Sequence, residues 1–244
     1  MKKNGIGLLF VLALILTPFV FSSGASLTVD VQNSVFSPTA KTKEGIIFLP
    51  KLTGAKAINV WLLSIMNSDG EVVKRFNSSN ALPEQILWDG LSGSLDELPD
   101  GKYSYQLFVD LGKEKLFVNG SSITLDTVPP FLSVRPATDI YFLGPDGNLN
   151  DDINIYLTCS DDEGIDYSKC SITIFNRKKI PIKTISFSNS IPEYVAWNGD
   201  DDIYGVTVPP GNYVIVFSVF DSAGNRARMA AMVSIVKKPV SVKE

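Results

Sequence analysis

The chain has 244 residues, a formal net charge of −4 and no histidine. The missing histidine excludes a Ser-His-Asp or Cys-His nucleophile and a histidine-ligated zinc site. The mild negative charge offers no basic surface for nucleic acid or for an anionic membrane face. We therefore expect no catalytic residues, no nucleic-acid partner and no cofactor, although carboxylate, lysine and tyrosine chemistry stays open.

Residues 1–25 have the pattern of a secretory signal peptide. Lys2 and Lys3 precede an apolar run over residues 6–21, and small residues follow at 22–26. This order of charge, apolar run and small residues is typical of export signals, and the run is short for a membrane span. We predict cleavage near Ala25 and export to the periplasm, the cell surface or the extracellular space. The alternative is an uncleaved N-terminal anchor.

The mature chain contains no second apolar stretch long enough to cross a bilayer, so we expect no transmembrane span there. Loss of Lys2 and Lys3 changes the net charge from −4 to −6. Short runs rich in β-branched and aromatic residues follow, bounded by Gly, Asn, Asp, Pro and Ser. The clearest runs are 58–66, 103–110, 153–159, 170–175 and 213–221. Because no sustained helical period is present, we predict an all-β protein built from antiparallel β-sandwiches.

One phrase occurs twice in the chain. A Trp-Asp/Asn-Gly triplet is followed, in each copy, by Pro-x-Gly-x-Tyr and an alternating apolar strand. The repeated residues are Trp88, Gly101 and Tyr103 in the first copy and Trp197, Gly211 and Tyr213 in the second. Internal duplication explains this economically. We interpret the tryptophans as core, the glycines as turn residues that allow positive φ, and the tyrosines as corner residues of immunoglobulin-like sandwiches; a carbohydrate-stacking platform is the alternative.

Between the copies, Pro129 and Pro130 predict a short, stiff, extended linker. The two domains are predicted to span residues 27–127 and 131–237, and residues 238–244 to form a tail.

An acidic loop follows the linker region and has the residue order that opens a calcium-binding loop. The candidate ligands are Asp146, Asn148, Asn150 and Asp152. Alternate oxygen ligands can face one cation. However, Asp151 stands where the EF-hand pattern has glycine, and Leu157 where it has glutamate. Calcium binding and a solvated turn both stay open. Two further acidic loops, 161–166 and 200–202, show no ligand spacing.

Cys159 and Cys170 are the only cysteines. An even count in an exported protein favours a disulfide, here between the end of one strand and the start of the next. The alternative is a pair of buried thiols that face separate sheets.

The pattern as a whole resembles the bacterial immunoglobulin-like domain shared by the C-terminal part of the flagellar hook-capping protein and certain exported proteases. It is carried by "INVWLLSIMNSDGEVVKRF" and "PDGKY" in the first copy, and by "PPGNYVIVFSVFDSAGNRA" in the second. The resemblance implies two tandem immunoglobulin-like β-sandwiches of a kind used as spacers and scaffolds. The first copy reads "DLGKEK" where the second has the Asp-x-x-Gly-Asn turn. The hook-capping role does not carry over, because that protein is exported without a cleaved signal peptide.

These observations favour an exported, non-catalytic scaffold, spacer or binding protein of the bacterial envelope or cell surface. Its partner would be an unidentified envelope protein or wall polymer, and exposed edge strands offer a means of capture by β-augmentation. The rival is an accessory subunit or enzyme that acts on envelope glycans through acidic residues such as Asp161 and Asp200. Such a carboxylate pair would have to face one cleft.

Overall fold

The computed structural model describes residues 24–54, 57–79 and 81–238. The predicted signal peptide lies outside the described residues except for its last two positions, and the predicted tail lies outside them except for Lys238. Among the described residues, no helix has the length and apolar character that a membrane crossing requires.

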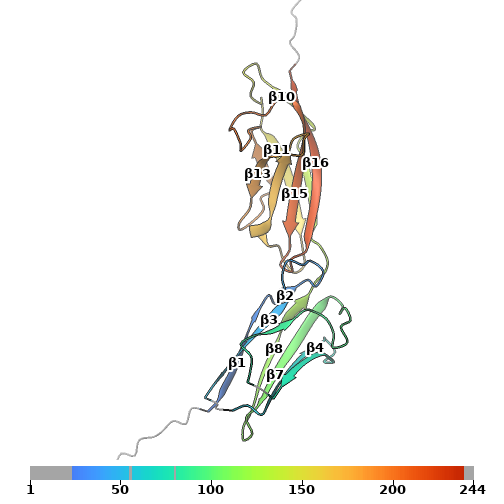
Figure 1. Ribbon diagram of the computed structural model, residues 1–244. Coiled ribbons are helices and arrows are strands. Elements are labelled where there is room, and N and C mark those ends of the chain that lie inside the picture. Colours follow the sequence, from blue (N-terminus) through green and yellow to red (C-terminus); the bar gives the residue numbers. More distant parts are fainter. Residues whose placement is uncertain (1–23, 55–56, 80, 239–244) are drawn as a thin grey trace, which may run out of the picture.

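Two β-sandwiches lie end to end (Figure 1). In the first sandwich a three-stranded sheet packs on a five-stranded sheet. The three-stranded sheet has the order β1 (Ser26–Gln32), β3 (Ile46–Thr53), β6 (Ile86–Trp88). The five-stranded sheet has the order β2 (Val35–Phe36), β8 (Lys115–Leu125), β7 (Gly101–Asp110), β4 (Val60–Met66), β5 (Val72–Ser78).

The second sandwich repeats this topology strand for strand. Its three-stranded sheet has the order β9 (Phe131–Pro136), β11 (Ile153–Ser160), β14 (Tyr194–Trp197). Its five-stranded sheet has the order β10 (Ile140–Leu143), β16 (Arg226–Lys237), β15 (Gly211–Phe220), β12 (Ser171–Phe175), β13 (Pro181–Ser186). The helical content of the described chain is one short turn, η1 (Tyr167–Lys169). The all-β, immunoglobulin-like sandwich fold predicted from the sequence is confirmed.

Strand register is also repeated. Ile46 pairs with Trp88 in the first sandwich, and Ile153 pairs with Trp197 in the second. The side chains that alternate inward from Tyr103 on β7 and from Tyr213 on β15 are all buried. Because side chains on a strand point alternately to its two faces, this register turns each apolar set into its own core. One cluster of buried residues lies within 36–125 and the other within 132–235.

The two repeated tryptophans occupy matching places in the two cores. Trp88 is 0% exposed and Trp197 is 1% exposed. Each indole nitrogen donates a hydrogen bond to the backbone oxygen three residues later, Leu91 O at 2.9 Å and Asp200 O at 2.8 Å. This burial leaves no ring face free, so the carbohydrate-platform interpretation of these residues is wrong.

The two repeated tyrosines make the same contacts in the two sandwiches. The rings of Tyr103 and Tyr213 meet their tryptophans edge to face, with centroids 5.5 and 5.8 Å apart. Their hydroxyls donate to Pro99 O and to Pro209 O, both at 2.6 Å.

The glycines of the phrase differ in backbone conformation. Gly101 has φ +145, whereas Gly211 has no positive φ, and a Cβ there would meet the Tyr213 ring at an ordinary 3.7 Å. The expectation of positive φ at Gly211 was therefore wrong. In the Trp-x-Gly triplets, Gly90 and Gly199 do take positive φ, at 81 and 83.

Candidate functional site at the junction of the two sandwiches

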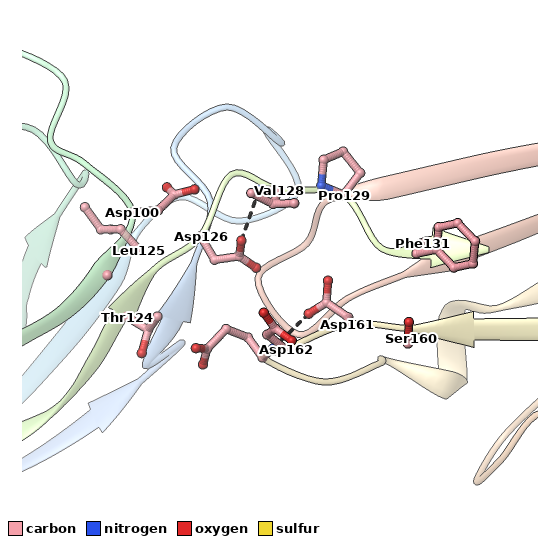
Figure 2. Close-up of a pocket in the computed structure, with 12 residues that line it drawn as sticks. Asp100, Thr124, Leu125, Asp126, Val128, Pro129, Phe131, Ser160, Asp161 and Asp162 are labelled. Carbon is pink, nitrogen blue, oxygen red and sulfur yellow. Dashed lines mark hydrogen bonds between the residues drawn. The ribbon is translucent and has the colours of Figure 1, made fainter.

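The two sandwiches are joined by the extended segment that runs from the end of β8 to the start of β9 (Figure 2). Asp126 begins the segment and is buried, Val128 and Pro129 are exposed, and Pro130 is buried again. An acidic groove of about 510 Å³ lies beside it. Five of the described residues that line the groove are acidic and none is basic: Asp100, Asp126, Asp161, Asp162 and Glu163.

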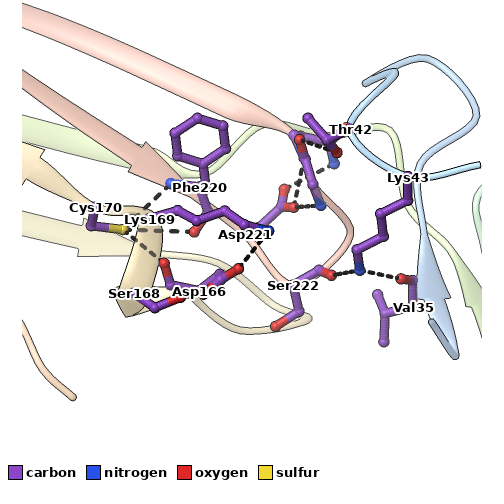
Figure 3. Close-up of polar contacts among 12 residues, drawn as sticks. Val35, Thr42, Lys43, Asp166, Ser168, Lys169, Cys170, Phe220, Asp221 and Ser222 are labelled. Carbon is purple, nitrogen blue, oxygen red and sulfur yellow. Dashed lines mark hydrogen bonds and ion pairs between the residues drawn. The ribbon is translucent and has the colours of Figure 1, made fainter. Parts of the chain in front are cut away.

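A loop of each sandwich contacts the other across the junction (Figure 3). The loop between β2 and β3 lies against the turn between β15 and β16. Ser37 N donates to Ala223 O at 3.2 Å, and Thr42 Oγ1 donates to Gly224 O at 3.2 Å. Lys43 Nζ donates to Ser222 O at 2.5 Å. Burial lowers the pKa of Lys43, and the nearby Lys169 lowers it further.

The β15–β16 turn is the Asp-x-x-Gly-Asn motif noted in the sequence. Asp221 Oδ1 accepts from Gly224 N at 2.6 Å and from Asn225 N at 2.8 Å. Asn225 Nδ2 in turn donates to Asp221 Oδ2 at 2.8 Å and to two linker oxygens, Asp126 O at 2.9 Å and Val128 O at 3.2 Å. The motif therefore gives a partner to the buried carbonyl of Asp126, which would be costly to leave unpaired, and to the partly buried carbonyl of Val128.

Glycine is required at position 224 because Thr42 of the first sandwich lies close to it. The φ of Gly224 is +104, and a Cβ at this position would come within 2.0 Å of Thr42 Oγ1. A larger residue would thus strain its own backbone and displace the loop of the first sandwich.

Three carboxylates converge where these elements meet. Asp126 follows β8, Asp161 follows β11, and Asp221 follows β15, and one oxygen from each lies within 4.8 Å of the others. Asp126 is 8% exposed and Asp221 is 1% exposed. None of the ion pairs found among the described residues involves this acidic cluster.

Within the acidic cluster, Asp126 has a buried oxygen without a hydrogen-bond partner. Its Oδ1 accepts from Val128 N at 3.0 Å, while its Oδ2 is buried without a hydrogen-bond partner. Figure 2 shows the free oxygen turned toward the loop that carries Asp161 and Asp162. Burial raises the pKa of Asp126 to about 6, and the charges of Asp221 and Asp161 add to this rise. Burial likewise raises the pKa of Asp161.

The calcium loop suggested by the sequence lies at the opposite end of the second sandwich, between β10 and β11. There both oxygens of Asp146 accept from Asn148, Oδ1 from its N at 3.0 Å and Oδ2 from its Nδ2 at 3.1 Å. Asn148 Oδ1 accepts from Thr207 Oγ1 at 2.9 Å. Asp152 is exposed. The loop is thus closed by its own hydrogen bonds, and calcium binding there stays a prediction.

The two cysteines are free thiols in the structure, on β11 and just before β12. Cys170 is buried, and its Sγ donates to Asp166 O at 3.2 Å. Burial raises the pKa of both thiols, and Cys170 adds to the rise at Cys159. The disulfide stays a prediction for the protein in an oxidising compartment.

The acidic pair weighed for glycan chemistry is not brought together. Asp161 follows the last residue of β11, whereas Asp200 follows β14 near Trp197, which pairs with the first residue of β11. An eight-residue strand is about 26 Å long. Asp200 instead forms an ion pair with Lys183 at 3.2 Å. These two carboxylates therefore cannot share one cleft.

Sequence reasoning missed Asp126 and Asp221 as members of a site. The sequence places Asp126 at the end of the first predicted domain, 27–127, and Asp221 in a turn of the family pattern, with no role in a site for either. A difference between the two copies could have indicated the site. By the strand register, Gly54 of the first sandwich corresponds to Asp161 of the second, and Leu111 corresponds to Asp221.

No protein-family model matches the chain, and no curated protein matches it significantly. Several solved structures are similar. One concerns a 1.5-MDa bacterial ice-binding adhesin, at 11% identity over 87% of this chain and 64% of that one, with a TM-score of 0.44. Another is a tetra-tandem repeat from the extending region of a large adhesion protein, at 15% identity over 87% of this chain and 50% of that one, with a TM-score of 0.36.

A third is the amphioxus IgVJ-C2 molecule, at 10% identity over 73% of this chain and 90% of that one, with a TM-score of 0.28. This chain thus spans less than two thirds of the two adhesion-protein structures. Scores this low carry no argument about activity, and the immunoglobulin-like assignment stands on the strand order itself.

Proposed function

We propose that the protein is an exported, non-catalytic scaffold, spacer or binding protein of the bacterial envelope or cell surface. The observation that carries this proposal is the construction of the junction. Two sandwiches with separate cores are set end to end. A buried hydrogen bond from Asn225 and a partly buried one from the β2–β3 loop tie one to the other. Such a join holds two modules at a defined spacing, which is what a spacer or presenting scaffold requires.

Two sequence features support the same proposal. The signal-peptide pattern of residues 1–25 favours export. The resemblance to immunoglobulin-like modules of hook-capping proteins and exported proteases favours an appendage role, since such modules serve as spacers on unrelated proteins.

Some edge strands are covered by loops, and this limits where a partner could add a strand. β5 and β13 are the outer edges of the five-stranded sheets, and a loop covers each. Gly93 N donates to Val73 O at 2.8 Å in the first sandwich. In the second, Thr184 N donates to Asp202 Oδ2 at 2.9 Å. Covered edges resist pairing with other chains.

The opposite outer strands of the five-stranded sheets, β2 and β10, are short, with 2 and 4 residues. The edges that remain are those of the three-stranded sheets. β1 and β9 are their long outer strands, and within the described chain neither pairs with a strand on its outer side. We therefore place β-augmentation by an envelope protein on β1 or β9. A wall polymer is the other partner class.

The test is fractionation of native cells followed by photo-crosslinking. A crosslinker at Thr28, exposed on β1, is compared with one at Thr184, exposed on the covered edge β13. We expect the protein outside the cytoplasm and one envelope component captured from Thr28 and not from Thr184. A cytoplasmic location overturns the proposal. So does turnover of a glycan or peptide by the purified protein that is lost when one acidic residue is replaced.

Modularity is tested separately. Fragments 27–127 and 131–237 each contain one complete core cluster. We expect each fragment to unfold cooperatively by itself. A fragment that shows no cooperative transition contradicts the division into two modules.

A further inference from the structure

We propose that the acidic cluster at the junction binds one divalent metal ion, with Ca²⁺ as the favoured ion, through Asp126, Asp161 and Asp221. One oxygen of each carboxylate lies within 4.8 Å of the others. Ca²⁺ binds oxygen ligands at about 2.3 to 2.6 Å, so ligand oxygens on one ion lie up to about 5 Å apart. The inference goes beyond the proposed function, because a scaffold requires no metal.

The burial of Asp126 is the independent sign that something is missing from this site. A side chain that is 8% exposed holds an oxygen, Oδ2, with no hydrogen-bond partner. A buried polar oxygen without a partner is unfavourable, and a buried carboxylate beside two others is more so. A cation among the three carboxylates would give Oδ2 a partner and offset the repulsion.

The carboxylates are already oriented. Val128 N holds Oδ1 of Asp126, and Glu163 N holds Oδ1 of Asp161 at 3.0 Å. Asp221 is held by two backbone N–H groups of its own turn. Hydrogen bonds that fix ligating carboxylates reduce the ordering cost of metal binding.

The cluster is confined to the junction. Gly54 lies eight positions after Ile46, as Asp161 lies eight after Ile153, and the two isoleucines hold equivalent places in the sheets. By the same register Leu111 corresponds to Asp221. The repeated fold therefore does not require these carboxylates, and they occur where the sandwiches meet.

The ligand chemistry selects the class of ion. The converging groups are all oxygens, which suits Ca²⁺ and Mg²⁺ and not the nitrogen and sulfur preference of zinc. The acidic groove beside the cluster adds Asp162 and Glu163, and it gives water access to the remaining coordination positions. Ca²⁺ is favoured because it tolerates irregular geometry, whereas Mg²⁺ demands a near-ideal octahedron.

An ion at this place would link the end of β8 in the first sandwich to the β11 and β15 ends of the second. It would therefore stiffen the junction. Solution scattering should show a narrower distribution of interatomic distances with Ca²⁺ than with EDTA.

The test is calorimetric titration of the mature, EDTA-treated protein with CaCl₂ and, separately, MgCl₂. Asp161→Asn is the test variant, since Asn keeps an oxygen for Glu163 N and removes the charge. Asp139→Asn, at an exposed position between β9 and β10 at the far end of the second sandwich, is the matched control. We expect saturable Ca²⁺ binding that is at least about tenfold weaker in Asp161→Asn, because ligand charge sets affinity in such sites, and unchanged in Asp139→Asn.

A second variant separates ligation from folding. Asp126→Asn should raise the Tm of the metal-free protein, because it removes a repelling charge, and should abolish the rise in Tm that Ca²⁺ causes. The proposal is overturned if neither ion binds up to about 10 mM, ten times the weakest affinity typical of extracellular calcium modules. It is also overturned if Asp161→Asn binds Ca²⁺ as tightly as the parent protein and Asp139→Asn do.

Discussion

A turn joins the two long strands at the same place in each sandwich, but it faces solvent in the first sandwich and lies against a neighbour in the second. The β7–β8 turn of the first sandwich is closed by Leu111 N donating to Glu114 O at 2.8 Å, and its tip is exposed. The β15–β16 turn of the second sandwich is buried, with Asp221 and Asn225 at 1% and 4% exposure. Equivalent positions in a duplicated fold thus acquired different chemistry according to what covers them. The cores, by contrast, kept the same Trp and Tyr.

The largest expected effect tests the sameness of the two cores. Trp88→Ala and Trp197→Ala should each lower the free energy of unfolding of their own sandwich by about 3 to 5 kcal/mol, as for other large buried aromatics. Denaturant unfolding of each fragment measures this. Tyr204→Ala is the control, because Tyr204 is 78% exposed and its loss should change stability by less than about 0.5 kcal/mol. Losses that differ by more than about 2 kcal/mol between the tryptophans would contradict the equivalence.

The next effect tests the difference between the turns. Gly112→Ala and Gly224→Ala both place a side chain at positive φ, which costs about 1 to 2 kcal/mol. At Gly112 the new Cβ would lie 3.3 Å from Nδ2 of Asn59, the end of a flexible side chain, whereas at Gly224 it would lie 2.0 Å from Oγ1 of Thr42. Gly224→Ala should therefore cost roughly 3 kcal/mol in all. Thermal unfolding of the full mature chain compares them.

Thr42→Ala provides the control for the glycine pair. Thr42→Ala removes the hydroxyl that the new methyl group would meet, and with it the hydrogen bond to Gly224 O. Relative to Thr42→Ala alone, adding Gly224→Ala should therefore cost little more than Gly112→Ala costs in the parent protein. If Gly112→Ala and Gly224→Ala cost the same, the turn does not depend on its neighbour.

A third effect concerns a feature of the second sandwich alone. Both cysteines lie there, and a bridge over residues 159–170 should stabilise that sandwich by about 3 kcal/mol in the chain-entropy model. Thiol titration of the unfolded, unreduced exported protein should find no free thiols. Reductant should then lower the unfolding midpoint of fragment 131–237 and leave fragment 27–127 unchanged. Two free thiols per chain would rule out the bridge.

The smallest expected effect tests the hydrogen bonds made by the two repeated tyrosines. Tyr103→Phe and Tyr213→Phe each remove one hydroxyl that donates to a proline carbonyl. Each should cost about 1 kcal/mol, the usual net value of a hydrogen bond. Tyr167→Phe, outside both cores, serves as the comparison. A loss in one sandwich without a loss in the other would show that the corners are not equivalent.

Much of the fold could be predicted from local pattern. Strands β7 and β15 alternate with period two, and this alternation indicates which side chains face a core before any partner is known. The Trp and Tyr of the repeated phrase lie within 16 positions of each other, so their contact depends on one turn and one strand. The repeat itself followed from spacing alone.

The sequence by itself therefore determined the fold class, the duplication and the inward faces of the strands, because these depend on residues close together in the chain. The tertiary structure decided what happens between the sandwiches. Asp126, Asp161 and Asp221 are separated by 35 and 60 positions, and no period or spacing relates them. They meet because three strands end at one junction, and only the docking of one sandwich on the other brings those ends together.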